Sequence, residues 1–420
     1  MKIKALKGVN DILPSEVNNW TYLENLSRRL FSQYAFREIR VPIIEESALF
    51  TRSIGEQTDI VEKEMYTFVD KGKRKIALRP EATASVVRAY LEHGLDSEGI
   101  AKLFYIGPMF RGEKPQSGRN RQFYQIGAEV LGSDSPYQDA EVIDIAIEFL
   151  KDLNLKNYKL HINSVGCPND KHKFSQTLKN YLLDKKEKLC ASCQNRYERN
   201  LLRILDCKNP GCKSILQKAP DISSHFCSDC TEHFTQVRTS LDALDIPYTV
   251  LPHLVRGLDY YTKTVFEINH KGLGAQDAIC AGGRYDTLIS DLGGATQGAC
   301  GFSFGIERLL LAAAAEKIAF EKEPAQAVYM FSFGQKAQIK ILALAQSLRK
   351  DGFCVFINHE QKPLKKLLRQ ADKAAYKFVL ILGEDELSQG VITLKNMQDG
   401  TQQPLKLDTI ADELNKILRK

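Results

Sequence analysis

The chain has 420 residues, of which 43% are hydrophobic and 26% are charged, as in an ordinary globular protein. Its length predicts two or three domains rather than one. The N-terminal residues lack the unbroken apolar stretch of a signal peptide, and the longest apolar runs, such as residues 309–315, are far too short to span a bilayer. We therefore expect a cytoplasmic protein with no membrane segment.

The first 150 residues alternate between helical and extended patterns. Residues 20–31 and 82–93 have helical spacing, and residues 38–44 have an extended pattern. Between residues 154 and 246 the composition shifts toward Lys, Cys and Asn, and strand and glycine signals return between residues 251 and 303. This order predicts one mixed unit of helices and strands that is interrupted by an insertion.

A different alternation begins at residue 327. Strand-like runs at residues 327–333, 353–357 and 377–383 are separated by helical runs at residues 335–350 and 363–376. Strands that alternate with helices are typical of a parallel sheet. The C-terminal part is therefore predicted to be a small α/β domain.

Basic residues are concentrated in this C-terminal part. The formal net charge is +6, and residues 327–420 carry 15 Lys and Arg against 10 Asp and Glu, a difference of +5. Five cations recur at spacings that place them on one helix face, namely Lys362, Lys366, Arg369, Lys373 and Lys377. Such a face can follow the phosphates of a nucleic acid, and a solvated basic surface explains it equally well.

Two alternating runs between residues 103 and 132 flank a polar loop, which predicts an antiparallel hairpin. Period-two alternation places five residues of the second run on one face, namely Arg121, Phe123, Gln125, Gly127 and Glu129. The first run ends in Arg111. Together these groups suit the binding of a phosphate, a base and an ammonium group, although a solvated outer face would show the same alternation.

Arginine, tyrosine and glycine recur together between residues 254 and 289. The segment holds Arg256, Tyr260, Tyr261, Gly282, Gly283 and Tyr285. Glycines allow the backbone to approach a ligand closely, and tyrosines donate hydrogen bonds from apolar walls. The segment therefore predicts part of a binding site, and a β-bulge with core tyrosines is the alternative.

Two junctions between a strand and a helix also carry polar side chains. Residues 298–312 form a glycine-punctuated strand that enters a helix with Glu307 and Arg308 in its first turn, and an earlier helix opens with Glu81 and Thr83. An arginine at a helix start suits phosphate binding. An ordinary surface arginine and a glutamate that pairs with the helix dipole are the alternatives.

These segments, in this order, carry a resemblance to a known family. The FRGE of residues 110–113, with the RQF that follows the loop, is similar to the second signature motif of the class II aminoacyl-tRNA synthetases. GFSFGIERL at residues 301–309 is similar to the third motif, and FREIRVPIIEE at residues 36–46 to the dimer-forming first motif. LVRGLDYYTKTVFE at residues 254–267 and AGGRYD at residues 281–286 resemble the two peptides peculiar to the histidine enzymes.

The resemblance covers essentially the whole chain and implies its fold. It implies an α+β catalytic domain over residues 1–323, built on an antiparallel sheet flanked by helices. A mostly helical, cysteine-rich insertion is expected at about residues 165–245. Residues 324–420 would form a C-terminal α/β anticodon-binding domain, and the enzyme would be a homodimer.

The resemblance also implies an activity and its residues. The enzyme would activate L-histidine with ATP and Mg2+ and transfer it to tRNA(His), with Arg256 and Arg111 as catalytic residues. The implied histidine-binding residues are Glu81, Thr83, Arg111, Gln125, Glu129, Arg256, Tyr260 and Tyr261. The implied ATP-binding residues are Arg111, Glu113, Arg121, Phe123 and Arg308.

Six cysteines lie between residues 190 and 230 of the predicted insertion, and their spacing is independent of the resemblance. Paired CxxC turns are typical of tetrahedral zinc sites. The predicted structural Zn2+ ligands are Cys190, Cys193, Cys227 and Cys230, with Cys207 and Cys212 as substitutes. The alternative is a set of reduced, partly buried thiols.

A non-enzymatic alternative is a synthetase-like regulatory subunit that pairs with a histidine-biosynthetic transferase. Such paralogues typically lack the anticodon domain and degrade the histidine peptides, whereas this chain retains both. A generic nucleic-acid-binding module would leave Arg111, Arg256 and Arg308 unexplained.

Overall fold

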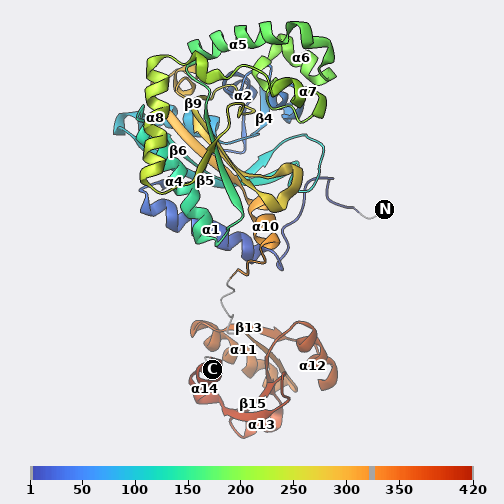
Figure 1. Ribbon diagram of the computed structural model, residues 1–420. Coiled ribbons are helices and arrows are strands. Elements are labelled where there is room, and N and C mark those ends of the chain that lie inside the picture. Colours follow the sequence, from blue (N-terminus) through green and yellow to red (C-terminus); the bar gives the residue numbers. More distant parts are fainter. Residues whose placement is uncertain (1–2, 321–326, 419–420) are drawn as a thin grey trace. The chain divides into compact units, whose positions relative to one another are not determined.

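The computed structural model describes residues 3–320 and 327–418 of the chain. The chain divides into two compact units, Met1–Phe320 and Glu321–Lys420 (Figure 1). The predicted domain boundary between residues 323 and 324 lies outside the described residues. Within the two described ranges, no helix combines the length and the apolar character needed to cross a bilayer.

An eight-stranded sheet forms the centre of the first unit. In spatial order its strands are β1 (Arg37–Glu38), β5 (Ala101–Phe110), β6 (Gln122–Leu131), β11 (Ala299–Gly305), β10 (Ala278–Arg284), β9 (Thr262–His270), β7 (Tyr158–Ser164) and β8 (Tyr248–Val250). The six inner strands pair antiparallel, and the edge strands β1 and β8 run parallel to their neighbours. The predicted antiparallel sheet is confirmed.

Side-chain alternation gives this sheet two different faces. Ile126, Ala128 and Val130 of β6 belong to the largest apolar core. That face is covered by α1 (Val17–Gln33), α4 (Pro136–Asp152), α8 (Ser228–Ala243) and α10 (Ile306–Ala315). Because successive strand residues point to opposite faces, Glu129 lies on the other face, where α3 (Thr83–Glu92) packs.

The first unit also has a second, smaller sheet and several short helices. A three-stranded antiparallel sheet has the order β2, β4, β3. The remaining bounds are β2 (Ile44–Glu46), α2 (Ser47–Ile54), η1 (Ile60–Glu64), β3 (Thr67–Val69), β4 (Lys75–Leu78), η2 (Leu95–Glu98), η6 (Lys271–Gln276) and α9 (Leu288–Asp291).

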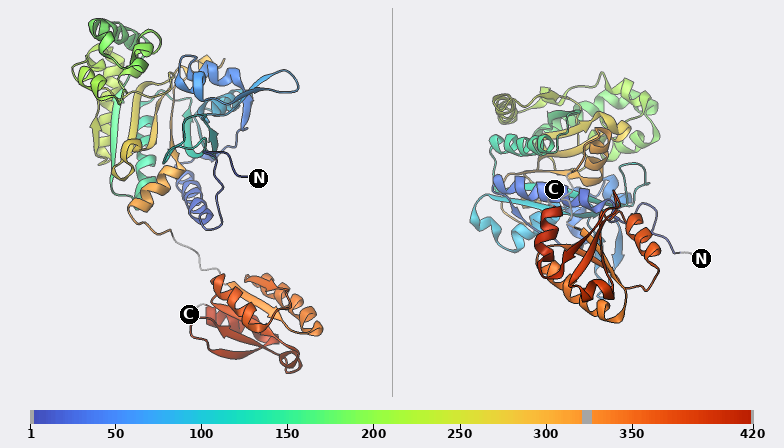
Figure 2. Two further views of the ribbon diagram at one scale, coloured as in Figure 1. Left: turned by 90° about the vertical axis from the view of Figure 1, so that its right-hand side faces the viewer. Right: turned by 90° about the horizontal axis from the view of Figure 1, so that it is seen from below.

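Between β7 and β8 the chain forms a mostly helical region with its own apolar core (Figure 2, green). Its elements are α5 (Pro168–Leu182), η3 (Leu183–Lys188), α6 (Ala191–Arg199), η4 (Leu201–Ile204), α7 (Pro210–Leu216), η5 (Ile222–His225) and α8. The chain then returns to the large sheet, because β8 pairs with β7. The inserted region therefore begins and ends at two neighbouring strands, β7 and β8.

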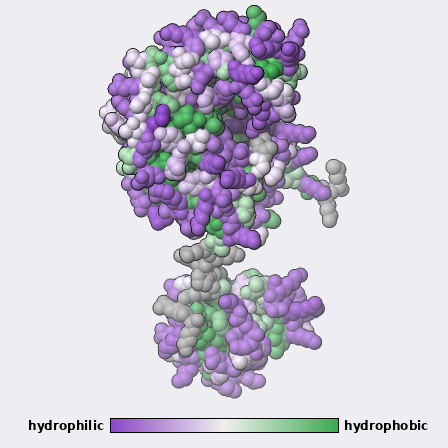
Figure 3. Space-filling view, viewed as in Figure 1, coloured by the Kyte–Doolittle hydropathy of each residue, from purple (hydrophilic) through white to green (hydrophobic). Residues whose placement is uncertain are grey.

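The second unit has a five-stranded sheet in the order β13, β12, β14, β15, β16. Its elements are β12 (Ala327–Ser332), α11 (Gln335–Lys350), β13 (Cys354–Asn358), α12 (Leu364–Lys373), β14 (Phe378–Leu382), α13 (Glu384–Ser388), β15 (Val391–Asn396), β16 (Gln402–Lys406), η7 (Leu407–Thr409) and α14 (Ile410–Leu418). The first three strands are parallel, as predicted, and the last two are antiparallel additions. The surface in Figure 3 is mostly hydrophilic, with small hydrophobic patches.

Candidate active site

A cavity of about 900 Å³ opens on the polar face of the large sheet. Its lining comes from β5, β6, β9, β10 and β11, from the start of α3 and of α10, and from the inserted region. Small-molecule sites usually enclose about 300–1,000 Å³, so this cavity has room for a nucleotide and a second small substrate.

Two carboxyl groups are buried together in this cavity. Glu81 is 4% exposed and Glu129 is 1% exposed. The backbone N–H groups of Thr83 and Ala84 donate to Glu81 at 2.6 and 3.0 Å, which fixes this carboxylate at the start of α3. The Thr83 hydroxyl donates to Glu129 at 2.7 Å, and Tyr285 donates to the other oxygen of Glu129.

The environment of these carboxyl groups favours the arrival of a cation. Burial raises the pKa of Glu129 to about 8, and the nearby Glu81 adds to the rise. Burial also raises the pKa of Glu81. Because a cation between two carboxylates stabilises both charged forms, this acidic pair suits an ammonium or imidazolium group.

Aromatic rings wall the acidic pair. The ring centroids of Tyr260 and Tyr261 are 4.8 Å apart, and those of Tyr260 and Tyr285 are 5.5 Å apart. Burial raises the pKa of Tyr261 to about 12, so its hydroxyl stays protonated and can donate. The rings therefore present an apolar wall with polar tips, which suits a small planar side chain.

Three arginines define the other part of the cavity. The Arg111 Nε donates to the Pro80 carbonyl at 2.9 Å, and its guanidinium lies 5.3 Å from the centre of the Phe123 ring. The Arg308 Nε donates to the Gly118 carbonyl at 3.0 Å. Arg119 also lines the cavity.

These arginines are close enough to repel one another. Burial lowers the pKa of Arg308, and the neighbouring Arg119 and Arg111 lower it further. Glu113 pairs with Arg119 at 2.9 Å and offsets part of this charge. Guanidinium groups that converge in this way suit a polyphosphate.

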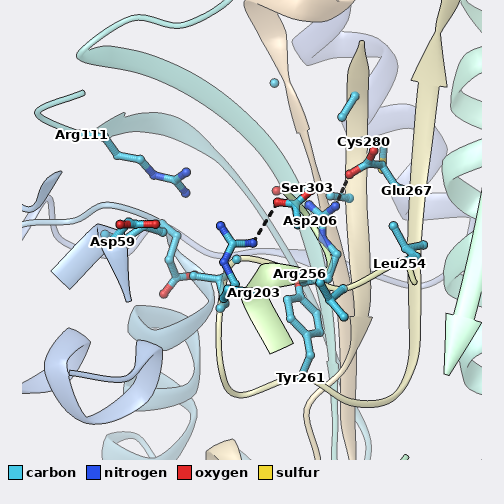
Figure 4. Close-up of a pocket in the computed structure, with 18 of the residues that line it drawn as sticks. Asp59, Arg111, Arg203, Asp206, Leu254, Arg256, Tyr261, Glu267, Cys280 and Ser303 are labelled. Carbon is cyan, nitrogen blue, oxygen red and sulfur yellow. Dashed lines mark hydrogen bonds and ion pairs between the residues drawn. The ribbon is translucent and has the colours of Figure 1, made fainter. Parts of the chain in front are cut away.

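Arg256 also lines the cavity, and Figure 4 shows it paired with Glu267. One of its terminal nitrogens is paired with Glu267, whereas its buried Nε has no hydrogen-bond partner among the described residues. Gln125 Oε1 is likewise buried without a partner in the described part of the chain. Because buried polar groups are normally satisfied, these two atoms point to a ligand that completes them.

The structure brings together most of the residues predicted for substrates. Those that line the cavity are Glu81, Thr83, Arg111, Glu113, Phe123, Gln125, Glu129, Arg256, Tyr260, Tyr261 and Arg308. Arg121 does not line it, because its Nε is directed to the Glu113 carbonyl, and its side chain lies close to Gly8.

Other cavity residues were missed by sequence reasoning. Arg119 lies in the loop that the sequence marked as polar, and the excess of cations in that loop was a usable signal. Tyr105 faces the cavity from β5, one strand before the predicted face. Arg203 and Asp206 reach the cavity from the inserted region, and no local pattern marked them.

Arg284 of the AGGRYD peptide has a structural position instead of a substrate-binding one. Its guanidinium is fully buried. It pairs with Asp139 of α4 and donates to the carbonyls of Ser133 and Ser135 at 2.8 and 2.9 Å. This arginine therefore ties β10 to α4 behind the cavity.

The predicted grouping of the zinc cysteines is wrong. The thiols of Cys190 and Cys193 lie with those of Cys207 and Cys212, within 4.8 Å of one another. Those of Cys227 and Cys230 lie in a separate group with Cys167 and Asp170. The reason is that Cys227 begins α8, whose N-terminus meets the start of α5, whereas α6 and α7 form their own contact.

This arrangement places the chain among the class II aminoacyl-tRNA synthetases. The cavity lies on an antiparallel sheet, and arginines from its strands and loops surround the space for phosphates. A parallel dinucleotide-binding sheet would instead offer a glycine-rich loop at a helix start.

Comparison with known proteins defines the family. Residues 8–309 match the model of histidyl-tRNA synthetase, and residues 327–417 match that of an anticodon binding domain. Histidine–tRNA ligases of Syntrophotalea carbinolica and Halothermothrix orenii are 45% and 46% identical, over 99% and 100% of this chain and 98% and 100% of theirs. The crystal structure of apo S. aureus histidyl-tRNA synthetase has a TM-score of 0.82 and 35% identity, and covers 98% of this chain and 100% of that chain.

The chain therefore belongs to the histidyl-tRNA synthetase family. The resemblance stated from the sequence is confirmed, and an aminoacyl-tRNA synthetase uses ATP as a substrate.

Proposed function

We propose that this chain activates L-histidine with ATP to histidyl-adenylate and transfers the histidyl group to the 3′ end of tRNA(His). The observation that carries this proposal is the presence in one cavity of a buried acidic pair and a group of converging arginines. Glu81 and Glu129 would hold the cationic groups of histidine, and the arginines would hold ATP. Relatives of the same length that carry the name histidine–tRNA ligase support the amino acid assigned.

The amino acid fits the acidic pair in one direction. Glu129 and Thr83 would bind the ammonium group, Glu81 would accept from the imidazole, and Tyr260 and Tyr261 would enclose the ring. Gln125 Oε1, which lacks a partner, would accept one further N–H of the substrate. The carboxylate of histidine would then point toward Arg111 and Arg256.

The nucleotide would occupy the arginine group. Phe123 would stack on adenine, because its ring lines the cavity next to the Arg111 guanidinium. Arg111 would bridge the histidine carboxylate and the α-phosphate, and Arg308 and Glu113 would position the rest of ATP. Arg119 takes the place of Arg121 in this proposal, because it is Arg119 that lines the cavity.

The first reaction is an in-line attack of the histidine carboxylate on the α-phosphorus, with pyrophosphate leaving. Catalysis of this step depends mainly on stabilising negative charge on the phosphoryl oxygens, because the histidine carboxylate attacks without losing a proton. Arg256 is held by Glu267 and has a free Nε, so it can donate to these oxygens without rearranging. The 3′-terminal ribose hydroxyl of tRNA(His) would then attack the adenylate carbonyl and displace AMP.

Two metal ions belong to the proposal. Glu64 and Glu113 line the cavity near Arg111, and carboxylate oxygens suit Mg2+, which would neutralise phosphate charge when it enters with ATP. The cysteines of the inserted region suit a structural Zn2+.

The partners of the chain follow from its two units. The basic face of α12, which includes the exposed Lys366 and Arg369, would contact the anticodon arm of tRNA(His). A homodimer would cover Ile44 and Val69 of the three-stranded sheet, whose side chains are 50% and 67% exposed. We propose a cytoplasmic location, because free thiols persist in a reducing compartment.

The regulatory-subunit alternative is not favoured. The anticodon-type unit is present, and relatives matched over the whole chain carry the ligase name. Arg256, Tyr260 and Tyr261 also line the cavity.

The test is histidine-dependent exchange of labelled pyrophosphate into ATP, compared with the other amino acids and without tRNA. Exchange with histidine alone is expected. Arg256→Ala should slow this exchange by about a hundredfold or more with only a small rise in the histidine KM. The matched control is Arg29→Ala, which removes an exposed arginine on α1 that pairs with Asp152. No exchange from a folded, ATP-binding chain would reject the proposal, and a nearly unchanged rate in Arg256→Ala would remove Arg256 from its role.

A further inference from the structure

Four cysteine side chains of the inserted region converge on one point. They are Cys190, Cys193, Cys207 and Cys212, and their sulfur atoms all lie within 4.8 Å of one another. The Sγ atoms of Cys190 and Cys207 are 3.8 Å apart. Four sulfurs at the corners of a tetrahedron with metal–sulfur distances of about 2.3 Å would be about 3.8 Å apart. The spacing therefore fits a tetrahedral metal ion.

Two helix starts hold three of these thiols in place. Cys190 is the N-cap residue of α6 and Cys193 lies in its first turn, so both sulfurs come from one tight turn. Cys212 lies in the first turn of α7, where Asn209 accepts from the N–H groups of Gly211 and Cys212. The N–H of Cys190 also points at the Cys212 sulfur, 3.2 Å away. Such an N–H group stabilises a thiolate.

The position of the group links it to the cavity. Cys190 and Cys207 both line the cavity, whereas Cys193 and Cys212 are fully buried behind them. Thiols form only weak hydrogen bonds with one another, so these bonds give little reason for four of them to converge. Coordination of a metal ion would account for the arrangement.

We propose that these four cysteines bind one Zn2+ as a tetrathiolate, and that this ion holds residues 203–208 in place as a wall of the active-site cavity. The metal site itself is independent of the proposed function, whereas its effect on the cavity rests on that function. The proposal replaces the sequence-based ligand set with one in which Cys207 and Cys212 are ligands.

The wall that the ion would hold bears charges next to Arg256. Arg203 pairs with Asp206 at 3.1 Å, and a Cβ on Gly257 would lie 3.6 Å from the Arg203 guanidinium. Cys207 follows Asp206 directly. A bond from Cys207 to zinc would therefore limit the freedom of this loop beside the proposed catalytic arginine.

The second group is explained without a metal ion. The buried Asp170 accepts from the N–H groups of Cys167 and Cys227 at 3.4 and 3.1 Å, so it joins the starts of two helices as a capping carboxylate. The structure does not place this group in the lining of the cavity.

The test measures zinc in the full-length protein, purified without chelator, and in two variants. Cys207→Ser is expected to bind one zinc ion per chain fewer than the wild type. Cys354→Ser, which removes an exposed thiol of β13, is expected to bind as much as the wild type. Equal zinc in Cys207→Ser and the wild type would overturn the proposal.

A second measurement covers the case in which Cys207→Ser does not fold. Wild-type protein loaded with Co2+ in place of zinc should show the intense sulfur-to-metal charge-transfer absorption and the visible bands of tetrahedral coordination. Protein whose cobalt spectrum shows no thiolate ligands would overturn the metal site.

The effect on the cavity is read from pyrophosphate exchange. Folded Cys207→Ser should have an ATP or histidine KM raised by about tenfold, the usual size of an effect transmitted through a supporting residue. Loss of zinc with unchanged KM values would overturn the proposal that zinc holds residues 203–208 as a wall of the cavity, and would leave the metal site supported. If the wild type binds this zinc and catalyses no exchange, the proposed function fails and the metal site stands.

Discussion

Replacing Glu129 with glutamine should stabilise the empty protein while it weakens histidine binding. The side chain is 1% exposed, and burial raises its pKa from 4.5 to about 8. Each pKa unit corresponds to about 1.4 kcal/mol. A carboxyl group with a raised pKa contributes stability below its ordinary pKa, and up to about 5 kcal/mol of this is lost as the pH rises through about 8.

The glutamine variant has no such proton to lose. The hydroxyls of Thr83 and Tyr285 can rotate to accept from its amide, so the variant keeps its hydrogen bonds. The melting temperature of the variant minus that of the wild type should therefore be several degrees larger at about pH 8.5 than at about pH 5. In pyrophosphate exchange its histidine KM should rise by roughly ten- to a hundredfold, since a hydrogen bond to a charged group contributes about 1.5–3 kcal/mol.

Glu316→Gln is the matched control, because the pKa of this carboxyl group is shifted in the opposite direction. Burial disfavours the charged form of Glu316, but the N–H of Asn157 and the side chain of His270 outweigh it and lower the pKa. The Glu316 carboxylate therefore contributes to the free energy of unfolding above its ordinary pKa, and this contribution is lost as the pH falls through the lowered pKa. The glutamine variant should accordingly be less stable than the wild type near neutral pH. If the gap between Glu129→Gln and the wild type is the same at both pH values, burial does not hold Glu129 neutral and the reasoning is refuted.

Three further predictions concern other parts of the chain. Arg308→Ala should raise the ATP KM by about ten- to a hundredfold in pyrophosphate exchange, because a charged donor to phosphate is lost; an unchanged KM contradicts this role. Arg284→Met should destabilise the first unit by about 3–5 kcal/mol, because Asp139 keeps a buried charge without its partner; an unchanged melting temperature contradicts it. Lys366→Glu with Arg369→Glu should weaken tRNA charging and reduce its dependence on salt, with exchange unaffected; equal salt dependence excludes this face from the contact.

The hairpin of β5 and β6 shows what local patterns can predict. The side-chain period of a strand is two, so the apolar set of Ile126, Ala128 and Val130 determined which face carries Glu129. The same rule failed for Arg121, which stands at the end of the alternating run. There β6 has not yet begun, and the backbone N–H of Arg121 donates to the Gly8 carbonyl, although its own carbonyl accepts from the N–H of Arg111.

The cysteines show what spacing alone could not decide. Two CxxC turns in one region allow a shared metal ion, but the pairing depends on which helix starts meet. That depends on the core of the inserted region, where α5 packs beside η4 and η5. Arg203 escaped notice for the same reason, because its approach to Gly257 joins segments that only the fold brings together.

The charges of the cavity also determine the direction in which histidine can bind. If the amino acid were reversed, its carboxylate would face Glu81 and Glu129, where burial already raises the pKa of both carboxyl groups and Glu81 raises that of Glu129 further. Its ammonium group would then face Arg111 and Arg308, where neighbouring positive charges already lower the pKa of Arg308. Both contacts would be repulsive. The opposite direction satisfies both ends and leaves the carboxylate beside the free Nε of Arg256, which is where an attack on the α-phosphate has to start.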